Sequence, residues 1–291
     1  MQEPIVIQGR TLHRSDLHSV RDLIQANPSW HRTRLSRELC EAWDWRRPDG
    51  SLKDMACRTM LLKLHRRGLI ELPAQVKSAN NHLRGAKAPD MLHSTDAVEC
   101  TLAQLSPVRL INTRGNRYHD DLFGCLLSRY HYLGFRSTVG EYMKYLVVDR
   151  HDRPLGCVLF GSSAWKCARR DEFIGWDAPA RERNLNRTTN NTRFLILPWV
   201  RVKNLASHAL GLAAGCLRDD WLEQYGHSPV LLETFVDRSR FAGTCYRAAN
   251  WQCVGQTRGR SRQDRNHNLS VPVKDIYLYP LSKTFRRELQ A

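Results

Sequence analysis

Three short blocks of apolar residues at helical spacing occupy the N-terminal quarter of the chain and predict three helices. Asn27-Pro28 ends the first block. A capping box of Ser51 and Asp54 opens the third block, which ends at Gly68. The apolar stripes comprise Leu17, Val20 and Ile24, then Leu35, Leu39 and Trp43, then Leu52, Met55, Ala56, Met60 and Leu64.

Residues 69–73 read Leu-Ile-Glu-Leu-Pro, which predicts a short strand that the proline ends. Three helices followed by a strand is the winged-helix order, so we expect a winged-helix DNA-binding domain over residues 1–75. The other face of the third helix is basic, as a recognition helix in the major groove requires. Its candidate nucleic-acid contacts are Lys53, Arg58, Lys63, Arg66 and Arg67. A helical bundle with a solvated basic face, or a protein-binding winged helix, fits the same pattern.

Residues 76–97 are polar and interrupted by Gly and Pro, which predicts a linker. Strand and helix patterns then alternate, so we expect an α/β domain with a mixed sheet over residues 98–291. Residues 117–130 predict a helix, residues 142–148 and 155–160 predict the two strands of a hairpin, and the apolar run 193–200 predicts a strand buried on both faces. The elements expected after these are a helix over 205–225, a strand over 229–235, a helix over 241–249 and a strand over 251–255.

The net charge of the chain indicates a polyanionic partner. The 291 residues contain 45 Lys and Arg against 29 Asp and Glu, a formal net charge of +16. Such an excess favours DNA or RNA, because each neutralised phosphate releases counterions. Further candidate phosphate contacts are Arg181, Asn184, Asn190 and Arg193, then Arg258 and Arg260. A solvated basic surface with flexible charged loops is the alternative.

Cysteine spacing and hydropathy indicate the compartment. The nine cysteines form no C-x-x-C pair, which suits reduced thiols. The N-terminus lacks the pattern of a secretory signal, and no apolar run approaches the ~20 residues that a bilayer span requires. We therefore expect a cytoplasmic protein with no membrane partner.

Two family resemblances meet in the second domain. The order of its elements is similar to a GNAT acyltransferase core, with Tyr246 on a helix that leads into a strand beginning at Trp251. The chain also resembles the DruA family of Druantia anti-phage defence systems, in residues 129–134, 170–176, 193–210 and 233–260. Members of that family also occur on mobile elements, alone or joined to transposases. The resemblance implies antiviral defence on DNA, with other defence or transposition proteins as partners.

The GNAT resemblance implies a turn, Arg/Gln-x-x-Gly-x-Gly/Ala, that holds the pyrophosphate of acetyl-CoA at a helix N-terminus. The matching residues are 201–206, in which Asn204 replaces the central glycine. A Cβ there restricts the backbone and the approach of a phosphate, although asparagine tolerates a positive φ better than most residues. We therefore expect acetyl-CoA to be disfavoured, and Arg201 and Lys203 to hold a nucleic-acid phosphate.

Carboxylates near a strand end are the first catalytic candidates. Glu233 and Asp237 lie toward the carboxyl end of an expected strand, the edge at which open α/β sheets place ligands. With His208 and Asp171 they predict a divalent-metal site for a nuclease or strand transferase. Ion pairing of the acids with nearby arginines, and an interior hydrogen-bonded role for His208, are the structural alternatives.

Tyrosines are the second catalytic candidates. Tyr130 beside His131, or Tyr246, has the chemistry of a nucleophile or an acid, whereas aromatic packing is the simpler role for each. Three functions stay open: a nucleic-acid-binding defence protein that processes or only reads its strand, a CoA-dependent acyltransferase acting on a nucleic-acid-associated or protein amine, and a transposition enzyme.

Overall fold

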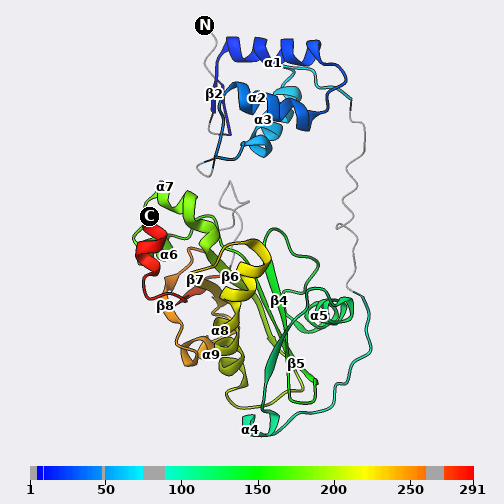
Figure 1. The fold of residues 1–291 in the computed structure, drawn as a ribbon, viewed down its shortest axis with the longest axis vertical. Coiled ribbons are helices and arrows are strands. Elements are labelled where there is room, and N and C mark those ends of the chain that lie inside the picture. The colour runs from blue at the N-terminus through cyan, green and yellow to red at the C-terminus, as the bar shows by residue number, and fades with distance from the viewer. Residues whose placement is uncertain (1–4, 9, 48–49, 75–88, 260–271) are drawn as a thin grey trace. The chain divides into compact units, whose positions relative to one another are not determined.

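The computed structural model describes residues 5–8, 10–47, 50–74, 89–259 and 272–291. The chain forms two compact units, Met1–Asn81 and His82–Ala291 (Figure 1). Each unit has its own hydrophobic core. No helix within the described ranges is long and apolar enough to cross a membrane.

The first unit packs three helices around one small core. Its elements are β1 Ile5–Ile7, β2 Arg10–Leu12, α1 Arg14–Ala26, α2 Arg32–Ala42 and α3 Asp54–Arg66. One residue or more of each apolar stripe is fully buried: Val20 on α1, Leu35 on α2, Met60 and Leu64 on α3. The three helices expected from the periodicity are therefore confirmed, because their stripes do form a common interior.

The strand expected at residues 69–73 is absent, since the described residues 67–74 contain no strand. The small sheet precedes α1 instead, where β1 and β2 pair antiparallel. The Leu69 carbonyl accepts two hydrogen bonds from the Arg21 guanidinium, which ties this segment to α1 rather than to a strand. The expected capping box is also wrong: Lys53 occupies the N-cap of α3 and makes no side-chain capping bond, while Asp54 pairs with Arg58.

The second unit is built on a mixed seven-stranded sheet in the order β3-β4-β5-β6-β7-β9-β8. Its strands are β3 Arg109–Asn112, β4 Tyr142–Val148, β5 Pro154–Ser162, β6 Thr188–Ile196, β7 Leu231–Asp237, β8 Gln252–Gln256 and β9 Lys274–Pro280. Among the strand pairs that the structure describes, β6 with β7 alone runs parallel. The fold is therefore mixed α/β.

Helices cover both faces of this sheet (Figure 1). The helices of this unit are α4 Leu102–Leu105, α5 Arg117–Tyr130, α6 Ala168–Ile174, α7 Ala178–Asn184, α8 Leu205–Tyr225, α9 Thr244–Ala248 and α10 Phe285–Gln290. Neighbouring residues of a strand point to opposite faces. Lys144 of β4 bonds Asp120 of α5 at 2.8 Å, and Tyr145 donates to Asp220 of α8 at 2.5 Å. Helices α5 and α8 therefore lie on opposite faces, and α9 packs beside α8.

Several bounds agree with the sequence prediction, those of α5, β4 and α8 to the residue. The apolar run 193–200 is the main exception. It overlaps β6, but residues 193–196 are only partly buried, so this strand is not enclosed on both faces. The helix expected over 241–249 is shortened to α9, because Gly243 takes a left-handed φ of 68° as its N-cap.

Part of the segment expected to be a linker contacts the second unit. Asp90 pairs with Arg129 of α5, and the His93 ring stacks on Trp199 at 5.9 Å. Val98 forms an isolated parallel bridge with Val200. Residues 90–98 thus join the loop that precedes α8.

Replacing Gly156 with alanine should destabilise the second unit by roughly 1–3 kcal/mol, the usual cost of overpacking. Its new Cβ would meet the Leu195 carbonyl where β5 pairs with β6, and backbone moves less readily than a side chain. Guanidinium denaturation measures the loss. The control is Gly211→Ala on α8, which has open space and should gain about 0.5–1 kcal/mol in helix propensity. Equal effects of the two substitutions would contradict the packing described.

Candidate functional site

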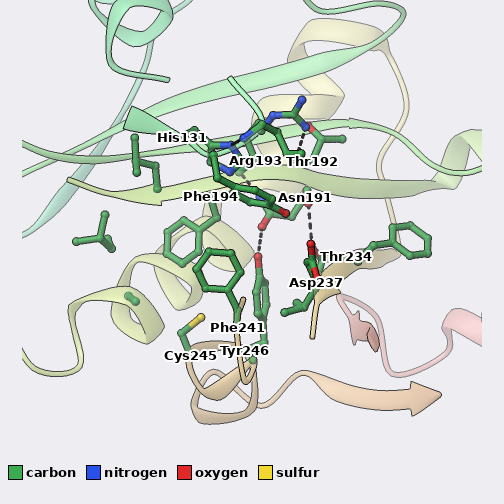
Figure 2. A pocket seen from close by; sticks show the side chains of 18 of the residues that line it. His131, Asn191, Thr192, Arg193, Phe194, Thr234, Asp237, Phe241, Cys245 and Tyr246 are labelled. Carbon is green, nitrogen blue, oxygen red and sulfur yellow. Dashed lines mark hydrogen bonds between the residues drawn. The ribbon is translucent and has the colours of Figure 1, made fainter. Parts of the chain in front are cut away.

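A cavity opens where the central strands of the second unit separate. Strands β6 and β7 pair only from Thr188–Asn190 to Leu231–Glu233, although both strands continue beyond these residues. A cavity of about 620 Å³ fills the space between their continuations (Figure 2). This volume lies in the range of about 300–1,000 Å³ that ligand pockets usually have. The strand separation is therefore the first candidate site.

Residues from both faces of the sheet line the cavity. Arg193 lies on the α5 face, since its Nε donates to the Gly134 carbonyl just beyond α5 at 3.1 Å. On the opposite face the Tyr246 hydroxyl of α9 donates to the side-chain oxygen of Asn191 at 2.7 Å (Figure 2). Ala206, in the first turn of α8, also lines the cavity. The cavity thus passes through the sheet and reaches the N-terminus of α8.

Asn191 holds β6 in place where β7 no longer pairs with it. Its amide nitrogen donates to the carbonyls of Leu159 and Arg193 at 3.0 and 3.1 Å. The Thr234 hydroxyl of β7 donates to the Asn191 carbonyl at 3.0 Å. Side chains thus replace part of the lost strand ladder. Because Asn191 is 3% exposed, each of these bonds is shielded from water.

Tyr246 is 7% exposed, and its ring stacks on Tyr277 at 5.7 Å. Burial raises the pKa of its hydroxyl, so the group stays neutral and donates a hydrogen bond to Asn191. Of the catalytic candidates, Tyr246 therefore lies in the cavity wall but is engaged in holding the strands.

Tyr130 and His131 do not face each other as a catalytic pair. The Tyr130 hydroxyl lies 2.9 Å from the His93 Nε2, and its ring meets Trp199 edge-on. Burial, with a smaller contribution from Arg193, lowers the pKa of His131 to about 4, so the imidazole is neutral at pH 7. Its Nδ1 accepts from the Leu133 amide at 3.2 Å, which places the proton on Nε2. His131 is thus a neutral hydrogen-bond donor in the cavity wall.

Glu233 and Asp171, two of the expected metal ligands, belong to a buried ion-pair network. Arg170 is fully buried and bonds Glu233 at 2.9 Å and Asp171 at 2.9 Å. Burial raises the pKa of Glu233, and the Arg170 charge opposes that rise. The Ala164 amide donates to the second oxygen of Glu233 at 2.7 Å. Both carboxylates are therefore held by protein donors, as the ion-pair alternative expected.

Asp237 and His208 lie elsewhere. Asp237 lines the cavity, and hydrogen bonds from the Ser239 hydroxyl and amide, at 2.7 and 3.0 Å, lower its pKa. His208 lies in the first turn of α8 and is partly exposed. Among the described residues no group of three or more His, Cys, Asp or Glu side chains is placed to hold a metal ion. The four expected ligands are therefore not brought together.

Two expected phosphate contacts of the second unit are used inside the protein. The Arg181 side chain is 13% exposed and lies 3.4 Å from Asp171. The Asn184 amide donates to the carbonyls of Leu289 and Ala291 at 3.2 and 2.7 Å. Both residues fasten α7 to its neighbours, which leaves little for a nucleic acid to contact.

The other basic candidates are more open. Arg201 is 76% exposed and pairs with Glu99 at 3.2 Å. Lys203 and Arg258 are exposed, and Arg260 lies outside the described residues. Asn190 and Arg193 line the cavity instead of an outer surface. The Asn190 side-chain oxygen is buried with no hydrogen-bond partner in the described part of the chain.

Sequence reasoning missed the contribution of three cavity residues. Asn191 gave no signal because its polar side chain lies within a strand pattern. Lys274 enters the wall because β9 pairs with β7, which puts it directly opposite Asp237. Phe241, expected in a helix, lies before α9 and is half exposed at the cavity. These placements depend on strand order and loop path, which a local pattern does not contain.

The second unit is a mixed α/β domain in which β6 and β7, the parallel pair among the described strands, diverge, and this arrangement is GNAT-like. The sequence model described as "Druantia protein DruA" matches residues 63–271, which is more than half of the chain. The chain therefore belongs to the DruA family. No curated protein matches the sequence.

Solved acetyltransferase structures are similar to parts of the chain. The spermidine/spermine N-acetyltransferase SpeG from Vibrio cholerae with manganese ions is 12% identical over 62% of this chain and 96% of its own, with a TM-score of 0.39. A dodecameric spermidine N-acetyltransferase from the same organism is 13% identical over 50% and 68%, with a TM-score of 0.32. Nourseothricin acetyltransferase is 13% identical over 48% and 66%, with a TM-score of 0.31.

Replacing Arg170 with methionine should cost roughly 3–5 kcal/mol, because the Glu233 carboxylate is then buried without a cation. The double variant with Glu233→Leu should recover most of this loss, since both charges are then removed. Chemical denaturation of both variants with and without EDTA tests the assignment. A loss that depends on EDTA would instead mark Glu233 as a metal ligand.

Proposed function

We propose that this protein is a nucleic-acid-binding member of the Druantia defence system, in which α3 of the first unit docks on duplex DNA. The observation that carries the proposal is the exposed basic end of α3. Arg66 and Arg67 are exposed, Lys63 is partly exposed, and none of the three forms an ion pair with a described residue. Unpaired cations on one helix attract phosphates because no local acid competes for them.

The opposite side of α3 supports this orientation. Met60 and Leu64 are fully buried in the core, so the helix is held against the unit with one face outward. Arg58 is a weaker contact, since it already pairs with Asp54 at 2.6 Å. Lys53 sits at the N-cap and is partly exposed. We therefore assign DNA contact to the last turn of α3 and expect its first turn to contribute less.

Arg66→Ala and Arg67→Ala should each weaken duplex binding and lower the slope of log K against log salt by about 1, the effect of one lost phosphate contact. Fluorescence anisotropy over a salt series measures both quantities. Arg14→Ala removes the same charge from an exposed position on α1 and is the matched control. A duplex affinity that ignores salt, or equal effects of all three substitutions, would refute the docking of α3.

Acyl-CoA binding is a second candidate, favoured by the backbone of Asn204. Its φ of 65° is a left-handed conformation, which glycine adopts without strain. Asn204 therefore has a backbone conformation that suits a glycine position, and Ala206 places the start of α8 against the cavity. Amide groups at that helix N-terminus suit a pyrophosphate. Acyl-CoA carries its acyl group on the thiol at the end of the molecule farthest from this pyrophosphate, and would supply it for transfer.

Acetyl-CoA at about a hundred times its Kd should stabilise the protein by about 2.7 kcal/mol if this second candidate holds, and so raise its Tm by several degrees. Differential scanning fluorimetry measures the shift. Ala206→Leu should abolish it, because the larger side chain fills the end of the cavity beside α8. No shift at about 1 mM acetyl-CoA, in the millimolar range of weak ligands, would eliminate acyl-CoA binding.

A further inference from the structure

The cavity wall on the α5 face carries two cations that form no ion pair within the described residues. Arg193 donates to two backbone carbonyls, from Nε to Gly134 and from Nη1 to Thr192, and forms no ion pair within the described residues. Burial lowers its pKa, which is the sign of a charge that has lost water without gaining an anion. Lys274 lines the same wall and forms no ion pair in the described ranges, although Asp237 lies opposite it and the Lys274 charge contributes to the lowered pKa of that carboxyl. The wall therefore has positive charge left for an anion, chiefly at Arg193.

Two aromatic side chains lie beside these cations. Tyr132 and Phe241 both line the cavity, yet they are 39% and 50% exposed. Their ring centroids are 5.4 Å apart at 60°, and the Arg240 guanidinium lies over Tyr132 at 5.1 Å. Large apolar rings left open at the edge of a cavity are typical of ligand contact, and flat faces stack well on a nucleobase.

An oriented acceptor completes this end of the cavity. Asp237 is on the same face as Lys274, because residues directly opposite in an antiparallel pair share a face. Ser239 fixes one of its carboxylate oxygens, so the group can accept from a sugar hydroxyl or a base amine. A simple phosphate would leave the rings unused, and a polyamine would be repelled by the cations. A nucleotide uses all three features.

We infer that the end of the cavity on the α5 face binds a nucleoside monophosphate moiety. Arg193 and Lys274 hold its phosphate, and its base packs against Tyr132 and Phe241. The moiety is either a free nucleotide or the phosphorylated end of a nucleic-acid strand, and the second source rests on the proposed nucleic-acid function. This end lies across the sheet from Tyr246, so the assignment is separate from the start of α8.

Isothermal titration of the full chain with AMP, adenosine and inorganic phosphate tests the inference. AMP should bind at least about tenfold more tightly than either fragment, since one charge-assisted contact or one stacked base contributes roughly 1.4 kcal/mol or more. Equal affinity for AMP and adenosine would overturn the phosphate assignment. Equal affinity for AMP and phosphate would overturn the stacking.

Substitutions locate the site. Arg193→Gln and Phe241→Ala should each weaken AMP binding by about tenfold, and Arg193→Lys should retain part of the affinity because it keeps the charge. Far-UV circular dichroism checks folding, and Lys274→Gln provides a second charge variant that leaves the Gly134 contact of Arg193 intact. Wild-type affinity in folded Arg193→Gln and Lys274→Gln would overturn the inference.

Two oligonucleotides, with and without a 5′-phosphate, show whether the ligand is a free nucleotide or the end of a nucleic-acid strand. If a 5′-phosphorylated oligonucleotide binds more tightly than its 5′-hydroxyl form and AMP competes with it, the site takes a strand end. If AMP binds and the phosphate on the strand has no effect, the ligand is a free nucleotide. Arg66→Ala should leave AMP binding unchanged. Absence of duplex binding by the wild-type chain thus counts against the proposed function but not against this site, and absence of AMP binding counts against this site but not against the proposed function.

Discussion

The second unit depends on the side-chain hydrogen bonds that hold β6 in place where its backbone pairing with β7 ends. Strands β6 and β7 pair over three residues and then separate, which exposes backbone donors and acceptors in the middle of a domain. An unsatisfied polar group there costs free energy comparable to a lost hydrogen bond. Asn191, Thr234 and Tyr246 meet part of that cost with side chains. The cavity exists because this replacement allows the sheet to stay open.

The same separation explains the division of polar groups in the second unit. Where β6 and β7 still pair, Glu233 is enclosed and neutralised by Arg170. Four residues further along β7, Asp237 lines the cavity, where Ser239 bonds one of its carboxylate oxygens. Two carboxylates on one strand thus have different surroundings, one enclosed in an ion pair and one at the cavity. Their position relative to the point of divergence decides which.

The sequence predicted elements whose pattern is local and complete. The helix α8 and the strand β4 have full periodicity and flanking breakers, so their bounds were found to the residue. The burial predicted for residues 193–196 was wrong, because an apolar run has the same sequence pattern beside a cavity as inside a core. The strands β3 and β9 were missed. The partner of Glu233 lies 63 residues away, and no spacing rule connects the two.

The candidate site residues show the same difference between local patterns and contacts between distant segments. Tyr246, His131 and Arg193 do line one cavity, but their grouping comes from the fold, since they belong to three separate segments. The expected metal set failed because it joined residues by residue type and strand end alone. Asn204 takes a positive φ, which asparagine tolerates better than most residues, and this conformation is a local property. Local conformation is thus readable from the sequence, and convergence of distant segments is not.

The bridge between Val98 and Val200 joins two segments that are far apart in the sequence. The Val98 amide donates to the Trp199 carbonyl and its own carbonyl accepts from the Arg201 amide, both at 2.9 Å. These two bonds fasten Val98 to the loop leading into α8. A movement of Val98 would therefore act directly on the loop that ends at the turn of Asn204.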